Sequence, residues 1–226
     1  MLVQIPSLLG AEQVADFRAR LEGANWVDGR VTAGHQSART KRNLQLREDD
    51  PVARALSEQL LQVIPSNLLF MACAVPFKIF PPLFNCYREG QGFGAHIDNA
   101  IRSVPDSPHR VRTDLSMTLF LSDTDEYEGG ELIIEDTFGG KKVKLPSGHA
   151  VLYPASSVHR VAPVTRGQRI AAFFWIQSMV RDAGRREVLF DLDLAIQQLN
   201  DENPDSAAGV RLTGVYHNLL RMWAHV

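Results

Sequence analysis

The chain has 226 residues, enough for one large domain with a buried core, and its 45% apolar and 22% charged residues are ordinary for a globular protein. A net charge of −2 gives no reason to expect nucleic acid or a membrane as partner, and no apolar run reaches the roughly 18 residues of a membrane span. Two cysteines, Cys73 and Cys86, are too few for a disulfide framework, and the first residues lack a signal-peptide pattern, so we expect a cytoplasmic protein.

The first part of the chain, residues 1–66, mixes helix and strand and is expected to support the core. Apolar residues recur at spacings of three and four over residues 11–23, which predicts a helix. A second helix is predicted to start at Asp49-Asp50-Pro51, because an acidic cap followed by a proline in the first turn is typical of a helix start. Its apolar side would carry Val52, Leu56, Leu60 and Ile64.

Residues 67–178 have a different character, with short apolar or alternating runs separated by turn residues. The runs are LLFMACAV, PLFNCY, LSMTLFL, ELIIE, KKVKL, AVLYP and RIAAFFWIQ. Roughly seven or eight short strands at this spacing predict a sandwich, barrel or jelly roll rather than an alternating α/β fold.

Residues 179–226 are predicted to be helical. One helical face is formed by Val188, Leu189, Leu192, Ile196 and Leu199. After a polar break at 200–208, a last helix carries a dense apolar stripe of Leu212, Val215, Tyr216, Leu219, Leu220 and Trp223. We expect a helical appendage that packs on the β core, with a homodimer contact as the alternative.

The candidate chemistry begins in the segment GFGAHIDNA, where His96 and Asp98 lie two residues apart. Side chains two apart on a strand point to the same face, so one strand can present an imidazole and a carboxylate to one ion. His159 follows about sixty residues later, before a predicted strand. Two histidines and one carboxylate on a β scaffold are the facial triad of non-haem Fe(II) oxygenases, whereas a closed structural zinc site would need a fourth protein ligand.

Arg169 lies ten residues after His159. The segment between them suggests a hairpin turn, and pairing of Pro163 with Gly167 would place Arg169 opposite Val161, about 7 Å along the strand from His159 on the same face. A guanidinium there suits the distal carboxylate of a five-carbon keto diacid that chelates iron through its other end. A slip of one residue would turn Arg169 to the other face.

Each of these residues has a simpler interpretation when taken alone: a loop histidine paired with Asp98, a strand-edge histidine and a surface arginine. Their combination on a predicted jelly roll favours the metal site. A cupin-like protein that senses or stores a ligand without oxidising it stays open, although a pure metal binder has no need of Arg169. A nucleic-acid demethylase is a weaker rival, because the chain lacks a long basic surface interleaved with aromatic residues.

Several longer blocks carry a family resemblance. They are YREG from Tyr87, HIDNAIRS from His96, YEGGEL from Tyr127, and the blocks PPLFN, RTDLSMTLFLS and TGVYHNLLRMW, with Arg169 ten residues after His159. Over residues 1–226 the chain resembles the bacterial PKHD-type hydroxylases, the PiuC-like proteins associated with iron uptake. These belong to the prolyl-4-hydroxylase-type branch of the 2-oxoglutarate oxygenases.

The resemblance implies a mainly β, α+β protein with a double-stranded β-helix (jelly-roll) core. It implies one Fe(II) bound by His96, Asp98 and His159, 2-oxoglutarate bound by Arg169, and leaves room for L-ascorbate as a supporting reductant. Tyr87 matches the tyrosine that lies against the co-substrate in this branch, a core aromatic being the alternative.

We therefore expect an Fe(II)- and 2-oxoglutarate-dependent dioxygenase that hydroxylates a substrate with release of succinate and CO2. The residues do not identify that substrate, and a siderophore, another small molecule or a protein side chain are all compatible with them. Asn85, Arg112 and Asp114 are further candidates for the pocket. The basic cluster of Arg39, Lys41 and Arg42 is interpreted as a solvated loop rather than a substrate contact.

Overall fold

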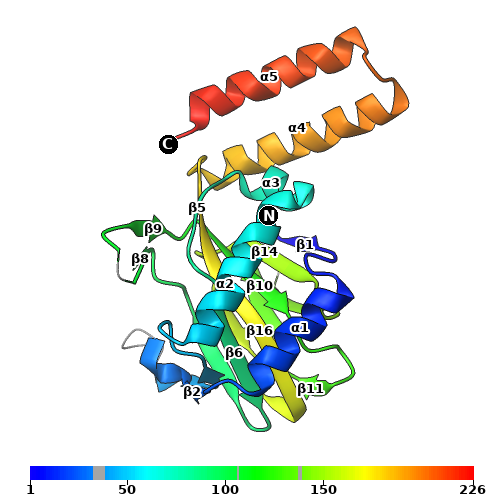
Figure 1. The fold of residues 1–226 in the computed structure, drawn as a ribbon. Helices are drawn as coiled ribbons and strands as arrows, with labels where there is room; N and C mark the ends of the chain where they lie inside the picture. Colours follow the sequence, from blue (N-terminus) through cyan, green and yellow to red (C-terminus); the bar gives the residue numbers. More distant parts are fainter. Residues whose placement is uncertain (33–38, 106, 137–138) are drawn as a thin grey trace.

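Two antiparallel β-sheets with helices on the outside make up the protein (Figure 1). The computed structural model describes residues 1–32, 39–105, 107–136 and 139–226. The sheets meet through a buried cluster that includes Tyr87, Phe120 and Val151 of one sheet and Leu132 and Val161 of the other. The predicted jelly-roll core is thereby confirmed.

The larger sheet is built around one long central strand. In spatial order its main strands are β1 (Val3–Ile5), β14 (Ala150–Pro154), β10 (Leu115–Phe120), β16 (Val164–Ser178), β6 (Leu83–Arg88), β4 (Leu44–Gln45) and β2 (Val27–Asp28). The strands β5 (Pro76–Ile79) and β11 (Tyr127–Gly129) also pair with β16.

The smaller sheet supplies the opposite layer. Its order is β13 (Gly139–Val143), β12 (Leu132–Asp136), β15 (His159–Val161), β7 (Gly92–His96) and β3 (Lys41–Arg42). A separate hairpin of β8 (Ile101–Ser103) and β9 (Arg110–Arg112) follows β7 along the chain.

Two of the helices, α1 (Ala11–Glu22) and α2 (Pro51–Val63), lie against the larger sheet (Figure 1). The predicted start of α2 is confirmed, because the Asp50 carboxylate accepts hydrogen bonds from the backbone N–H groups of Val52 and Ala53. Short 3-10 turns occur at Gly29–Thr32 and Ile64–Ser66.

The run LLFMACAV was predicted to be a strand and is instead α3 (Leu68–Ala74). The Asn67 side chain accepts a hydrogen bond of 2.9 Å from the backbone N–H of Phe70 and so caps this helix. Phe70, Cys73 and Ala74 are buried at helical spacing. A good cap and a continuous apolar run therefore formed a short buried helix, a case that periodicity alone does not separate from a strand.

Strand alternation divides the larger sheet into two chemically different faces. On β16, Ile170, Ala172 and Phe174 join the core under α1 and α2. The residues between them point the other way, toward the smaller sheet, as expected for a period of two. This inner face carries buried polar side chains, among them Asn85, Ser116, Thr118 and Arg169. A sandwich interior that holds polar groups needs partners for them, which marks it as the place to look for a site.

The C-terminal helices form the predicted appendage at one end of the sandwich (Figure 1). They are α4 (Ala183–Glu202) and α5 (Ala207–Trp223), which pack on each other around Val180 and Leu189. Trp223 and Leu220 of the predicted stripe join that cluster, whereas Met222 stays 72% exposed. The homodimer alternative stays a prediction. No helix in the described ranges is long and apolar enough to cross a membrane.

Close backbone approach between β7 and β15 predicts a sensitive position at Gly92. A Cβ atom placed there would lie 2.9 Å from the Val161 carbonyl oxygen and 3.2 Å from the Pro163 nitrogen, both backbone atoms that cannot rotate away. We expect Gly92→Ala to lower the free energy of unfolding by about 1–3 kcal/mol, measured by denaturant titration. Gly23→Ala is the matched control, because nothing lies within 4 Å of its added atom. Equal stability of both variants would contradict this packing.

Candidate active site

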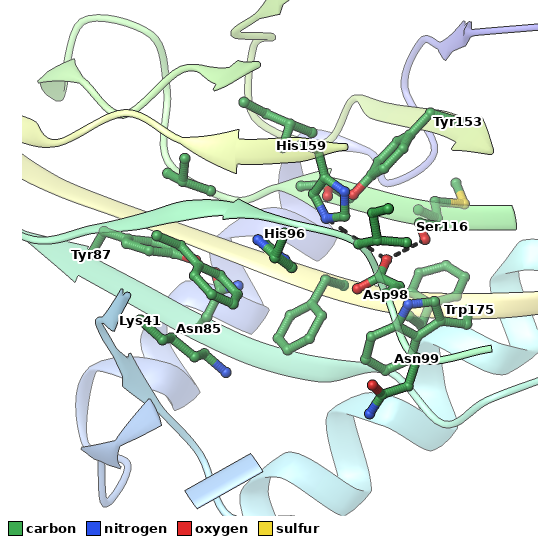
Figure 2. A pocket seen from close by; sticks show the side chains of 18 of the residues that line it. Lys41, Asn85, Tyr87, His96, Asp98, Asn99, Ser116, Tyr153, His159 and Trp175 are labelled. Carbon is green, nitrogen blue, oxygen red and sulfur yellow. Dashed lines mark hydrogen bonds and ion pairs between the residues drawn. The ribbon is translucent and has the colours of Figure 1, made fainter. Parts of the chain in front are cut away.

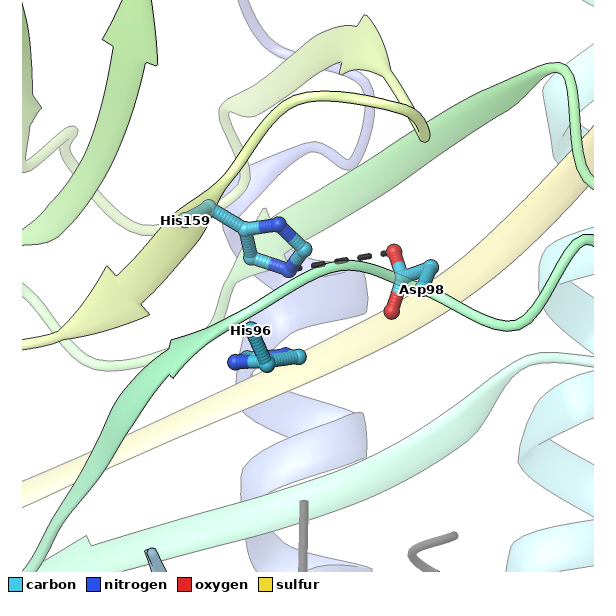
Figure 3. Close-up of side chains that lie close together, drawn as sticks. All are labelled: His96, Asp98 and His159. Atoms are coloured by element: carbon cyan, nitrogen blue, oxygen red, sulfur yellow. Dashed lines mark ion pairs between the residues drawn. The ribbon is translucent and has the colours of Figure 1, made fainter. Parts of the chain in front are cut away.

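The strands β7 and β15 pair so that His159 stands opposite His96, with ring centroids 4.2 Å apart (Figure 3). Asp98 follows two residues after β7 ends, and its Oδ2 lies 3.7 Å from Nε2 of His159. One donor atom from each of the three residues lies within 4.8 Å of the others. Within the described ranges this is the one group of three such side chains that could hold a metal ion.

Backbone carbonyls orient both imidazole rings. Nδ1 of His96 lies 2.8 Å from the Gly94 oxygen, and Nδ1 of His159 lies 3.0 Å from the Ser157 oxygen. A carbonyl only accepts, so each Nδ1 carries the proton and donates it. The lone pair is then on Nε2 in both rings, the arrangement that metal-binding histidines need.

The Asp98 carboxylate is held by its own partner. Ser116, on the inner face of β10, donates a hydrogen bond of 2.6 Å to Oδ2 of Asp98 (Figure 2). This contact places the carboxylate beside the two rings although Asp98 itself lies outside regular structure. Ser116 is only 2% exposed, so the contact is shielded from water.

The environment keeps His96 ready for a cation. Burial first, and then the neighbouring His159, lower the pKa of His96 from 6.5 to about 4. The Phe93 ring stacks on it with centroids 3.6 Å apart. At neutral pH the ring is therefore unprotonated, and no proton has to leave His96 before it can bind a metal ion.

The donor set fits Fe(II). Two neutral imidazoles and one carboxylate suit it, and the protein supplies no fourth ligand from the described cluster. The thiols of Cys73 and Cys86 lie in the core under the helices and do not contribute.

Arg169 lies in the same pocket as the triad but not where the hairpin prediction put it. The predicted pairing with Val161 is wrong: Val161 pairs within the smaller sheet, whereas Arg169 pairs with Tyr87 in the larger one. The chain passes from one sheet to the other between them, so Arg169 reaches the interior from the opposite layer. The hairpin failed because β16 pairs with β11 at Gly167 instead.

Burial makes Arg169 unusual. It is 1% exposed, and its guanidinium lies 5.4 Å from the Tyr87 ring centroid and 5.0 Å from that of Phe120. Its Nε has no hydrogen-bond partner in the part of the chain that the structure describes. Leaving a charged donor buried and unsatisfied costs free energy, which indicates that an anion completes the site. The distal carboxylate of a keto diacid fits this requirement.

Of the remaining residues predicted from the sequence, one lines the pocket and two do not. Asn85 lines the pocket, whereas Arg112 and Asp114 form an ion pair of 2.7 Å outside its lining. The prediction of a solvated loop is wrong for Lys41, which is 5% exposed and lines the pocket.

Three further residues that line the pocket were not predicted from the sequence: Ser116, Tyr153 and Arg102. Ser116 had one usable signal, because it alternates with Thr118 as a polar residue among the apolar residues of its strand.

The hydrogen bond from Ser116 predicts a measurable effect on metal affinity. Ser116→Ala should raise the dissociation constant of Fe(II) about tenfold, because Asp98 loses the group that orients it. An anaerobic competition titration against a chelator measures this. The matched control is Ser122→Ala, a buried serine that contacts the backbone of Gln168 and Ile170 away from the triad. It should lower stability without changing metal affinity, and equal affinities in both variants would refute the orienting role.

A second prediction concerns acid stability of the metal-free protein. The pKa of His96 is lower in the folded chain than in the unfolded one, so the unfolded state binds more protons between about pH 6.5 and about pH 4. Stability from this group is complete above that window and is lost as the pH falls through it. In denaturant titrations, the free energy of unfolding of His96→Gln should fall less between about pH 6.5 and about pH 4 than that of wild type. His109→Gln, at an exposed position, serves as control, and an unchanged fall in His96→Gln would argue against the shift.

Comparison with known sequences identifies the family. Residues 82–177 match the profile of the 2OG-Fe(II) oxygenase superfamily, and residues 183–225 match that of the PKHD-type hydroxylase C-terminal domain. The chain is 58% identical to a PKHD-type hydroxylase of Saccharophagus degradans over 224 residues, covering 99% of both chains. It is 54% identical to the PKHD-type hydroxylase PiuC of Pseudomonas aeruginosa over 226 residues, covering 100% of both.

Solved structures show the same fold at low identity. A prolyl hydroxylase from Trichoplax adhaerens, in complex with a hypoxia inducible factor peptide fragment, has a TM-score of 0.53 at 16% identity over 83% of this chain and 86% of its own. HygX from Streptomyces hygroscopicus, with nickel and 2-oxoglutarate bound, has a TM-score of 0.54 at 16% identity over 76% and 81%. With the triad geometry, these relationships identify the chain as a member of the PKHD-type hydroxylases of the 2OG-Fe(II) oxygenase superfamily, an Fe(II)- and 2-oxoglutarate-dependent enzyme whose iron is bound by His96, Asp98 and His159.

Proposed function

We propose that the enzyme hydroxylates a small molecule or a peptide side chain, with 2-oxoglutarate bound between the triad and Arg169. The observation that carries this arrangement is the buried Arg169, whose Nε has no partner among the described residues, in the pocket that also contains His96, Asp98 and His159. A co-substrate with a carboxylate at each end can satisfy the metal at one end and the guanidinium at the other.

Two tyrosines border the Arg169 end. Burial raises the pKa of Tyr87 to about 12, and the charge of Arg169 opposes this rise. Burial also raises the pKa of Tyr127, and the neighbouring Arg169 opposes this rise. Both phenols therefore keep their protons at neutral pH. The Tyr87 ring lies against the guanidinium as a neutral group, so the charge of Arg169 is left for the co-substrate.

The other residues of the chain hold and shield the reacting groups. Nε2 of both histidines and the Ser116-oriented carboxylate of Asp98 would hold Fe(II) at this end of the pocket. When bound, Fe(II) and 2-oxoglutarate supply the oxidation: O2 is consumed, 2-oxoglutarate becomes succinate and CO2, and a substrate C–H becomes C–OH. Leu132 and Val161 cover the interior side of the pocket and exclude water from it.

The role of Arg169 is testable without the substrate. Binding of 2-oxoglutarate to the anaerobic Fe(II) protein is followed by the visible charge-transfer band between metal and keto acid. Arg169→Gln should weaken 2-oxoglutarate binding by about 10–100-fold, the cost of losing a charge-assisted hydrogen-bonded pair, while the Fe(II) affinity stays unchanged.

Arg166→Gln is the matched control. Arg166 lies on the same strand, three residues earlier, but forms an exposed ion pair with Glu128. Its variant should bind 2-oxoglutarate as wild type does. If Arg169→Gln also retained wild-type affinity, the proposed position of the co-substrate would be wrong.

A further inference from the structure

The pocket contains more positive charge than the chemistry described so far uses. Among the described residues that line it, one is a carboxylate, Asp98, and three are cations, Lys41, Arg102 and Arg169. A divalent metal with Asp98 and a doubly negative co-substrate with Arg169 are together neutral. The positive charges of Lys41 and Arg102 are not part of this neutral set. Neither the metal nor the co-substrate therefore explains why these two side chains line the pocket.

Lys41 reaches the pocket from the edge of the smaller sheet. Figure 2 shows Lys41 beside the pocket. Lys41 pairs with Phe93 on β7, is 5% exposed, and its ammonium group donates a hydrogen bond of 2.8 Å to the side-chain oxygen of Gln45. Nζ lies 5.5 Å from the Phe93 ring centroid and 5.9 Å from that of Phe173. Because Phe93 stacks on His96, the ammonium is one side chain away from the metal ligand.

Arg102 reaches the pocket from the β8–β9 hairpin, four residues after Asp98. Its guanidinium stacks 4.1 Å from the Trp175 ring centroid and 4.9 Å from that of Phe80. Its Nη2 lies 3.8 Å from a Glu48 oxygen, and its Nε is buried without a hydrogen-bond partner among the described residues.

The two cations occupy the ends of one continuous row. The rings of Phe173 and Trp175 touch edge to face with centroids 5.6 Å apart, Lys41 lies over the first and Arg102 over the second. None of these rings is shared with Arg169, which lies over Tyr87 and Phe120. The Lys41–Arg102 row is therefore a separate part of the pocket from the proposed carboxylate position at Arg169.

The two positive charges of this row oppose each other. Burial, and next the charge of Arg102, lower the pKa of Lys41 from 10.5 to about 8. Burial also lowers the pKa of Arg102, against the charges of Glu48 and Asp98. Placing like charges in a poorly solvated pocket costs free energy that cation–π contacts offset only in part. An anion that enters between the two cations would lower this free-energy cost.

We propose that Lys41 and Arg102 bind a carboxylate of the primary substrate, with an apolar or aromatic part of that substrate lying against Phe173 and Trp175. A single negative charge fits, because Glu48 already offsets part of the charge of Arg102. The Arg102 fork supplies directed donors and the Lys41 ammonium a compact charge. This inference rests on the proposed function, because it assumes that the co-substrate fills the Arg169 end.

The test uses benzoate as a probe and benzamide as its neutral isostere. The full-length protein is loaded with Zn2+, which has no redox chemistry, and saturated with 2-oxoglutarate, and probe binding is measured by ligand-observed NMR. Wild type should bind benzoate about tenfold more tightly than benzamide. That preference should disappear in Lys41→Met and in Arg102→Gln, and should persist in Lys41→Arg.

Lys141→Met, at an exposed position on β13, is the matched control and should keep the preference. Equal binding of the two probes to wild type would overturn the inference, as would an undiminished preference in both pocket variants. Displacement of benzoate by 2-oxoglutarate would also overturn it, since the probe would then occupy the co-substrate position. If a variant does not fold, as judged by its thermal unfolding, the wild-type probe comparison and Lys41→Arg still decide.

A final arm separates this inference from the proposed function. Arg169→Gln is titrated with both probes in the absence of 2-oxoglutarate. A benzoate preference there, together with wild-type-like 2-oxoglutarate affinity of the same variant, means that the role of Arg169 is wrong while the Lys41–Arg102 row does bind a carboxylate. Loss of 2-oxoglutarate binding without any benzoate preference means the reverse.

Discussion

The pairing of β7 with β15 is the constraint on which the rest of the site depends. It sets His159 opposite His96 on neighbouring strands. Gly92 permits the close approach, and the two carbonyls that accept from Nδ1 belong to the same two segments. Because the backbone fixes both position and tautomer, the metal ligands are preorganised before any ion binds. Asp98 then needs only Ser116 to complete the set.

The second constraint is the burial of polar groups on the inner face of the larger sheet. Burying the polar side chains of Arg169, Ser116 and Asn85 between two sheets costs stability, and folding alone does not require it. The structure tolerates it because α1 and α2 cover the opposite face with a continuous apolar core, which adds to the apolar cluster between the sheets. The side chains of the site thus lie on one face of β16 and the core under α1 and α2 lies on the other, because side chains alternate along a strand.

This division explains what the sequence could and could not predict. The triad was accessible because His96 and Asp98 are close in sequence, and their chemistry depends little on register. Arg169 was assigned to the correct pocket through a wrong pairing, since which strand accompanies β16 is decided by tertiary contacts that a hairpin motif does not show. Lys41 was misread as solvated because β3 is a two-residue edge strand, too short for any alternation to be visible. The α3 segment was predicted wrongly for a related reason, because its length fits a strand as well as a helix.

The positions of the three cations suggest how the fold separates common chemistry from individual specificity. Arg169 lies on the long central strand, held on both sides by neighbouring strands, where a substitution would disturb the whole sheet. Lys41 and Arg102 lie on a short edge strand and a peripheral hairpin, which can change length or residue without altering the triad. In the proposed arrangement, the co-substrate, which is the same in every turnover, is bound by the most constrained part of the molecule. The proposed carboxylate of the primary substrate is bound by the least constrained part, so specificity can change without a new catalytic centre.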